Sequence, residues 1–235
     1  MDAKAFCTSC GSLLNPDVRF CPNCGQPQGM GSTPAGPPSV FVPPTGVRSQ
    51  TGRWLGIGWR MTQQDLGVFV VAGLLYLLLV TMVPVILQGP LHAGFMIMGF
   101  KKLLGRKVLL EDLFRGLKFF VPALVASLLI LVFVFLGTLA CIIPGIVVAA
   151  ALSFTYAFIV DKRMDFWPAI QASHAIVRQD YFGFTMFLIA CVLVNLVGVL
   201  CCIVGVLVTI PVTQCAIAAA YQDIVGLQPG NPDLA

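Results

Sequence analysis

Three long blocks without Asp, Glu, Lys or Arg dominate the chain, at 66–100, 119–160 and 181–222. A membrane-spanning helix needs about 20 apolar residues, so each block is longer than one helix requires. Segments rich in Gly, Pro or Cys fall near the middle of the blocks: Gln88–Pro90, Cys141–Gly145 and Cys202–Gly205. Because Gly and Pro interrupt regular structure, each block is predicted to form a helical hairpin, which gives six transmembrane helices.

A short amphipathic stretch precedes each block, at 53–64, 107–118 and 165–180. The clearest predicted apolar faces consist of Leu110, Leu113, Phe114 and Leu117 in the second stretch, and Phe166, Ile170, Ser173 and Val177 in the third. Such spacing indicates helices that lie at a membrane surface. We interpret the chain as three repeats of interfacial helix plus hairpin, with a period of roughly 60 residues; the alternative is that any interfacial helix shows this pattern.

Composition supports a membrane protein and also divides the chain. Hydrophobic residues make up 58% of the 235 residues and charged residues only 10%, whereas soluble domains carry about 25% charged residues. The segment 26–50 is rich in Pro and Gly and is predicted to be a linker. The predicted fold is therefore an all-α polytopic membrane bundle over 53–226, with a small metal-binding head over 1–25 and a C-terminal tail over 227–235.

The distribution of basic residues predicts the topology. If every block crosses the membrane twice, all 14 Lys and Arg residues lie on one face, which the positive-inside rule places in the cytosol. We therefore expect a multi-pass protein of the bacterial cytoplasmic (inner) membrane with both termini cytosolic, and no secretory signal at the start. The second helix, 90–104, is the weak point, because it is short and requires Lys101 and Lys102 to snorkel or the helix to be re-entrant.

The N-terminal head contains two Cys-x-x-Cys pairs, each followed by glycine, and its candidate metal ligands are Cys7, Cys10, Cys21 and Cys24. Four thiolates can surround one tetrahedral Zn²⁺ and leave no open position for a substrate. About 25 residues cannot fold on hydrophobic burial alone, so one structural zinc per chain would supply the folding energy. Two disulfides, or an iron centre of rubredoxin type, are the alternatives. The motif resembles the bacterial zinc-ribbon family, which implies a structural, non-catalytic site.

The charge of the N-terminal head indicates which class of partner it can bind. Lys4 and Arg19 are balanced by Asp2 and Asp17, and a zinc ion with four thiolates adds about two negative charges. Nucleic-acid binding needs a basic patch, so a protein partner is expected instead.

Polar residues are rare inside the blocks. His92, Asn195 and Gln214 are the candidate intramembrane polar site, although interhelical hydrogen bonding is the simpler interpretation of the two amides. The cysteines at the predicted outer turns, Cys141, Cys201 and Cys202, either pack as small apolar residues or form a disulfide.

The membrane part resembles a family of uncharacterised bacterial six-helix proteins related to the membrane domain of glycerophosphodiester phosphodiesterase. The segments that carry the resemblance are Gly89–Leu91 with Gly94, Leu113–Gly116, Ile143–Ile146, Val160–Lys162 and Phe166–Ala169 with Ser173. The catalytic domain of the phosphodiesterase has no counterpart in this chain, so its activity is not implied.

These observations rank three function classes. The blocks contain no Asp, Glu, Lys or Arg, so the clustered acids, bases or nucleophiles of an enzyme are not expected. Ion-coupled transport usually relies on intramembrane ionisable residues, which leaves a carrier for an apolar or uncharged solute, or for lipid, as the alternative. The sequence favours a membrane-embedded adaptor or regulatory protein that contacts membrane lipid and binds a protein through its zinc ribbon.

Overall fold

The computed structural model describes residues 5–6, 13–14, 41–228 and 231–234. The chain divides into two compact units, Met1–Val42 and Pro43–Ala235. In the first unit, β1 (Ala5–Phe6) pairs with β2 (Leu13–Leu14) in an antiparallel hairpin, with Ala5 opposite Leu14 and Phe6 opposite Leu13. The first Cys-x-x-Cys pair lies between these two strands in the sequence. A two-stranded hairpin is at best marginally stable alone, so this unit needs a further source of folding energy.

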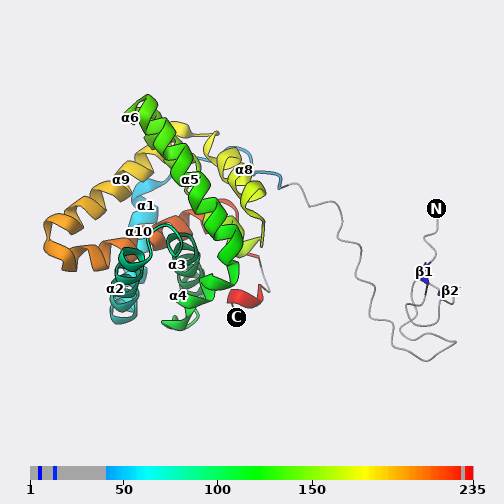
Figure 1. The fold of residues 1–235 in the computed structure, drawn as a ribbon, viewed down its shortest axis with the longest axis horizontal. Helices are drawn as coiled ribbons and strands as arrows, with labels where there is room; N and C mark the ends of the chain where they lie inside the picture. Colours follow the sequence, from blue (N-terminus) through cyan, green and yellow to red (C-terminus); the bar gives the residue numbers. More distant parts are fainter. Residues whose placement is uncertain (1–4, 7–12, 15–40, 229–230, 235) are drawn as a thin grey trace. The chain divides into compact units, whose positions relative to one another are not determined.

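The second unit is helical (Figure 1). Its helices are α1 (Thr51–Gln64), α2 (Leu66–Met82), α3 (Gln88–Leu103), α4 (Glu111–Arg115), η1 (Gly116–Phe119), α5 (Phe120–Ala140), α6 (Ile142–Ala151), α7 (Thr155–Asp161), α8 (Phe166–Val177), α9 (Tyr181–Leu200), α10 (Cys202–Ile224) and η2 (Pro232–Leu234). The order repeats three times: a helix from an amphipathic segment (α1, α4 or α8) precedes the helices of an uncharged block, which are α2 and α3, then α5 to α7, then α9 and α10. The predicted turns at Gln88, Cys141 and Cys202 all lie beside helix boundaries.

Four segments of the described chain are long and apolar enough to cross a membrane: Glu111–Leu139, Ile143–Asp161, Tyr181–Leu200 and Gly205–Ile224. A fifth candidate is the pair α1 and α2, which bends by 101°. The bend occurs at Asp65, whose backbone leaves the helical region with φ −129° and ψ 44°. Several apolar helices are therefore present, and the six-helix topology stays a prediction.

Helix α3 is the predicted weak second helix, and it occupies the interior of the bundle. Every residue from Ala93 to Lys101 is buried, and α3 packs against α4, η1, α5, α7 and α10. Close approach explains the glycines on both sides of this contact: a Cβ on Gly94 of α3 would lie 2.0 Å from the Leu113 carbonyl oxygen, and one on Gly116 of η1 would lie 2.1 Å from that of Pro90. Because protein surrounds it, α3 does not need the apolar surface that a lipid-facing helix requires.

Helix α10 is the second central element and packs against α1, α2, α3 and α9. Gly58 of α1 lies so close that an added Cβ would meet the Val212 carbonyl oxygen at 2.6 Å. In Figure 1 the α9–α10 pair runs in a different direction from α5 and α6. The start of α6 also approaches the start of α9, since Ile143 and Phe182 line one groove. Three hairpins in a common direction would separate these two positions.

The amphipathic segments agree only in part with their predicted faces. In α8, Ile170, Ser173 and Val177 of the predicted face are buried and Phe166 is half-buried, while His174 and Arg178 are exposed. In the second segment, Glu111 and Arg115 form an ion pair at 2.9 Å. Of the predicted apolar face of that segment, Leu113 is buried, whereas Phe114 and Leu117 lie on the surface of the bundle; the charged residue Asp112 is fully buried. Asp112 turns inward because it pairs with a lysine of α3.

The predicted linker and the predicted C-terminal tail both form hydrogen bonds with the helical unit. The end of the 26–50 linker is bound at Gln179, whose amide nitrogen donates to the Pro44 carbonyl oxygen at 2.7 Å. In the predicted 227–235 tail, Asn231, Asp233 and Leu234 are buried. The Asn231 amide donates to the Val160 carbonyl oxygen at 3.0 Å, and Asp233 forms ion pairs with Lys118 and Arg163. These contacts connect the last described residues to the basic loops between the predicted hairpins.

Candidate functional site

The predicted zinc ligands Cys7, Cys10, Cys21 and Cys24 all lie outside the described residues. Their chemistry nevertheless fits the metal, because four thiolates complete a tetrahedral structural zinc site without another ligand. In the described part of the chain, no three His, Cys, Asp or Glu side chains gather as a metal site would require. The residues that could hold zinc are therefore the four ribbon cysteines.

The other candidate residues, His92, Asn195 and Gln214, line a single cavity of about 250 Å³. They reach it from α3, α9 and α10, which are far apart in the sequence. Ser153 and Tyr156 also line the cavity and add two hydroxyl groups. The remaining wall is mostly apolar and consists of Met96, Ile130, Ala149, Leu152, Leu188, Cys191, Val192, Thr213 and Ile217. The structure thus places the rare polar residues of the blocks together.

His92 is held between two tyrosines. Its ring stacks on Tyr156, with centroids 5.3 Å apart, and meets Tyr76 edge to face at 5.4 Å. Its Nδ1 lies 2.9 Å from the Gln88 carbonyl oxygen. A carbonyl oxygen only accepts, so Nδ1 carries the proton, and Nε2 of the neutral ring is then an acceptor. The Tyr76 hydroxyl, 3.3 Å from Nδ1, further fixes the orientation of the ring.

The two amides of the cavity differ in how they are satisfied. The Asn195 Nδ2 group donates to the Cys191 carbonyl oxygen at 2.9 Å and to the Thr213 hydroxyl at 3.3 Å. The bond to Thr213 is the interhelical bonding expected of amides in a membrane, and it joins α9 to α10. The Asn195 Oδ1 atom is buried and finds no donor among the described residues. Gln214 is only 8% exposed, and its amide makes no hydrogen bond within 41–228 and 231–234.

Ser153 and Tyr156 are the cavity residues that the sequence did not single out. Neither hydroxyl has a hydrogen-bond partner in the part of the chain that the structure describes. Their spacing of three residues places them on the same side of a helical segment, which is the signal that could have linked them. Nothing in the sequence connects that side to His92, since the contact depends on how the hairpins pack.

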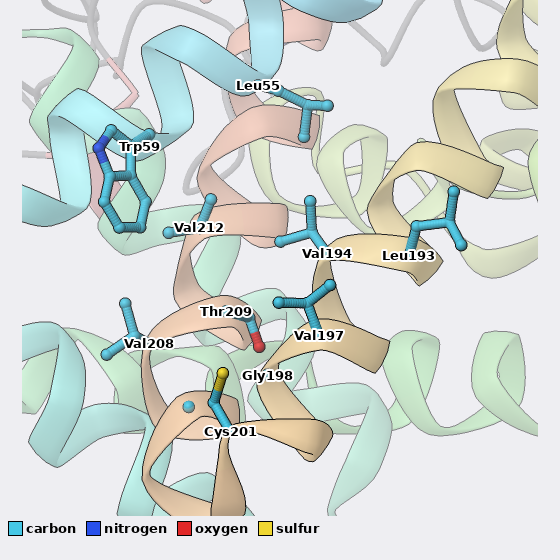
Figure 2. A pocket seen from close by; sticks show the side chains of 11 residues that line it. Leu55, Trp59, Leu193, Val194, Val197, Gly198, Cys201, Val208, Thr209 and Val212 are labelled. Carbon is cyan, nitrogen blue, oxygen red and sulfur yellow. The ribbon is translucent and has the colours of Figure 1, made fainter.

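A second, apolar groove of about 600 Å³ lies on the surface of α1, α9 and α10. Figure 2 shows its lining side chains, including Leu55, Trp59, Val194, Val197, Val208 and Val212. Beneath it, α9 and α10 approach so closely that a Cβ on Gly198 would lie 2.3 Å from the Thr209 hydroxyl. Such a surface suits lipid chains, because its lining is apolar apart from Trp59, Cys201 and Thr209 and contains no charged side chain.

Several charged residues of the helical unit are paired with one another. Lys101 Nζ lies 2.9 Å from Asp112 Oδ1, and both side chains are almost fully buried. Lys102 pairs with Asp65 at the α1–α2 bend. Buried Asp161 accepts from the Tyr221 hydroxyl and from the Gln228 backbone, each at 2.9 Å. These carboxylates are committed to structural contacts at helix ends, outside the cavity.

Asp180 joins the incoming chain to α9. Its side chain accepts from the Ser49 N–H at 3.0 Å and, as the N-cap of α9, from the Gly183 N–H at 3.0 Å. The Ser49 hydrogen bond lowers the pKa of Asp180, with a further contribution from the Gly183 hydrogen bond. The carboxylate is stabilised because both donors favour its charged form.

Comparison with known proteins supports the head and leaves the helical unit without a named function. Residues 6–28 match the zinc-ribbon domain family, so the chain carries an N-terminal zinc ribbon. An uncharacterized protein of Mycobacterium bovis and one of Mycobacterium tuberculosis are each 34% identical over 105 residues, which cover 45% of this chain and 32% of each relative. An uncharacterized protein of Synechocystis is 47% identical over 47 residues, 19% of this chain and 14% of its own.

This chain thus spans about a third or less of the length of the curated relatives that it matches. No solved structure matches it. The zinc ribbon and the apolar helices together fit a bacterial membrane protein with a zinc-ribbon head. The relation to the membrane domain of glycerophosphodiester phosphodiesterase finds no support among these relatives and stays a resemblance.

Proposed function

We propose that this protein is a membrane-embedded adaptor or regulatory protein, in which the helical unit supplies location and the zinc ribbon binds a protein partner. One observation supports this role above the others: the helical unit uses its buried charges for its own structure. Lys101 and Asp112 neutralise each other, and Asp161 is occupied by Tyr221 and Gln228. A proton-coupled carrier or a membrane enzyme uses such groups for its chemistry.

The zinc ribbon is the part proposed to recognise the partner. Its four cysteine ligands leave no open metal position, so it acts through its surface and has no catalytic role. Residues 1–25 carry two basic and two acidic side chains, and the thiolate-bound zinc makes the unit more negative. The resulting charge does not favour nucleic-acid phosphates, and a protein surface is the better match.

The proposed location is the bacterial cytoplasmic membrane, with the ribbon and both termini in the cytosol. The one-sided distribution of Lys and Arg supports this orientation. Reporter fusions after residue 50, within 105–112, within 162–175 and at the C-terminus should all report a cytoplasmic location. A periplasmic signal from either internal loop would contradict the topology, and the 105–112 loop after buried α3 is the most stringent position.

The adaptor role is tested by purifying the protein from native membranes and identifying what accompanies it. Removal of residues 2–25 should abolish co-purification of the partner protein, because the ribbon is proposed to be the recognition unit. The matched control is the pair Asn195→Leu and Gln214→Leu, which alters the cavity and should leave the partner bound.

The opposite pattern would support the alternative, a carrier for an uncharged solute. Solute flux into proteoliposomes that persists without residues 2–25, and is abolished by Asn195→Leu with Gln214→Leu, would overturn the adaptor proposal. This alternative is tested because the Asn195 and Gln214 amides line the same cavity, where an uncharged solute could bind.

A further inference from the structure

We propose that the cavity between His92, Tyr156 and Gln214 binds the uncharged polar head of a lipophilic molecule, such as an alcohol or carbonyl group on an apolar body. This inference concerns the helical unit only and does not depend on the adaptor role of the ribbon. It rests on the hydrogen-bonding groups of the cavity, its lack of charge, its size and its position at the surface of the helices.

Unsatisfied hydrogen-bonding groups are the first argument. Gln214 is more than nine-tenths buried, lines the cavity and has no hydrogen-bond partner among residues 41–228 and 231–234. Asn195 Oδ1, on a residue that lines the same cavity, is buried and has no partner in that part of the chain. The hydroxyls of the half-buried Ser153 and Tyr156 line it as well and are unpaired there. Leaving a buried polar group without a partner costs about 1–3 kcal/mol, and the great majority of such groups in native proteins are satisfied. A ligand or ordered water must therefore complete this cluster.

The donor and acceptor roles of these groups define which hydrogen-bonding groups the ligand can carry. His92 Nδ1 donates to the Gln88 carbonyl oxygen, so Nε2 of the neutral ring can only accept. The Gln214 amide donates and accepts, and a hydroxyl does both. A hydroxyl group on the ligand can donate to His92 or to the Gln214 oxygen while accepting from Tyr156. A carbonyl group can accept from Gln214 and Tyr156 together.

The charge of the ligand follows from what the cavity lacks. No Asp, Glu, Lys or Arg is among its lining residues. An ion would have to leave water for an apolar environment without a counter-charge, and that transfer is strongly unfavourable. The neutral, hydrogen-bonding wall therefore excludes carboxylates, phosphates and amines, and it favours uncharged polar groups.

Size and position favour the head of a lipophilic molecule over a free solute. The volume of about 250 Å³ is just below the range of roughly 300–1,000 Å³ typical of pockets that enclose a whole ligand. Val192 lines the cavity and is 57% exposed on the outer surface of α9. The cavity thus reaches the apolar surface of the helices, and the body of the ligand can remain among lipid chains while its head is enclosed.

The test uses the purified full-length protein in lipid nanodiscs and a long-chain alcohol that carries a photoreactive diazirine next to its hydroxyl end. We expect saturable labelling that peptide mapping places on residues lining the cavity. An unlabelled long-chain alcohol should compete, whereas an alkyl sulfate and an alkane of the same length should not. Labelling that is diffuse or not saturable, or that the alkane competes equally well, would show that only lipid partitioning or water fills the cavity and would overturn the proposal.

Variants connect the labelling to the named groups. Gln214→Leu and Tyr156→Phe should each weaken competition by the alcohol about fivefold, the effect of one lost hydrogen bond. The matched controls are Gln222→Leu on the same helix and Tyr181→Phe, whose hydroxyl contacts His174 outside the cavity. Thermal unfolding of each variant separates loss of binding from loss of fold. Equal affinity in the cavity variants and their controls would refute the assignment.

Discussion

The buried ion pair between Lys101 and Asp112 gives the sharpest energetic prediction for the helical unit. Lys101 is 5% exposed and Asp112 is fully buried. Asp112 Oδ1 accepts from Lys101 Nζ at 2.9 Å, and Asp112 Oδ2 accepts from the Leu109 N–H at the same distance. Removing the carboxylate with Asp112→Ala leaves the lysine charge inside the protein without its partner. Breaking a buried pair in this way typically costs about 3–5 kcal/mol.

For a domain of this size, 1 kcal/mol corresponds to a change of about 2–4 °C in Tm, so Asp112→Ala should lower Tm by roughly 6–20 °C. The assay is thermal unfolding in detergent followed by tryptophan fluorescence, since Trp54 is fully buried in the folded protein. The exposed control is Glu111→Gln, which removes the neighbouring surface ion pair to Arg115 and should cost at most about 0.5 kcal/mol.

A double variant distinguishes an unpaired charge from a general loss of packing. Replacing both partners, as Lys101→Met with Asp112→Leu, removes the buried charges together and should restore most of the lost stability. The reasoning is refuted if Asp112→Ala is no more destabilising than Glu111→Gln, or if the double variant is as unstable as the single one.

Three further predictions concern zinc, packing and pH. Cys21→Ser should abolish binding of the single zinc while the protein still inserts into membranes, and finding iron or no metal in wild-type protein purified without oxygen would contradict it. Gly94→Ala should cost about 3 kcal/mol of stability, because the added Cβ would clash with the α4 backbone. The control is Gly56→Ala, where an added Cβ would enter open space, and it should be neutral or stabilising in the same thermal unfolding assay. Asp180→Ala should cost about 1 kcal/mol at neutral pH through the lost N-cap. Because the folded pKa is depressed, that stabilisation is present above the unfolded value of about 3.9 and is lost as pH falls through the folded pKa, so wild type and variant should converge in acid; a difference that persists there would contradict the assignment.

Helix positions were predictable because charge and apolar length act locally. The last charged residue before the third block is Asp180, and α9 begins at the next residue. The buried face of α8 followed from its spacing for the same reason. Burial against protein and burial in lipid look alike in a sequence, however, so the central position of α3 could not be predicted. Its glycines give a partial signal, but the partner surfaces on α4 and α5 are tertiary features.

The remaining features could not be predicted because they depend on contacts between residues far apart in the sequence. Asp112 reads as the polar side of a surface helix until Lys101 of α3 is placed beside it. His92, Asn195 and Gln214 were recognisable as unusual because polar residues are costly in an apolar block. Their convergence with Tyr156 depends on contacts between hairpins, which no local pattern encodes. The attachment of the predicted tail through Asp233 to Lys118 and Arg163 is a further contact of this kind.

The division of labour between ribbon and helical unit is tested most directly by site-specific photocrosslinking in living cells. A photoreactive amino acid is placed at Asn23 in the ribbon, and in separate strains at Trp167 on α8 and at Val192 on α9. The adaptor proposal predicts a discrete protein adduct from Asn23 that disappears when Cys7→Ser is added to the same chain, while the Val192 position yields mainly lipid. Protein adducts that form only from the helical positions, or an Asn23 adduct that survives loss of the zinc ligand, would contradict it.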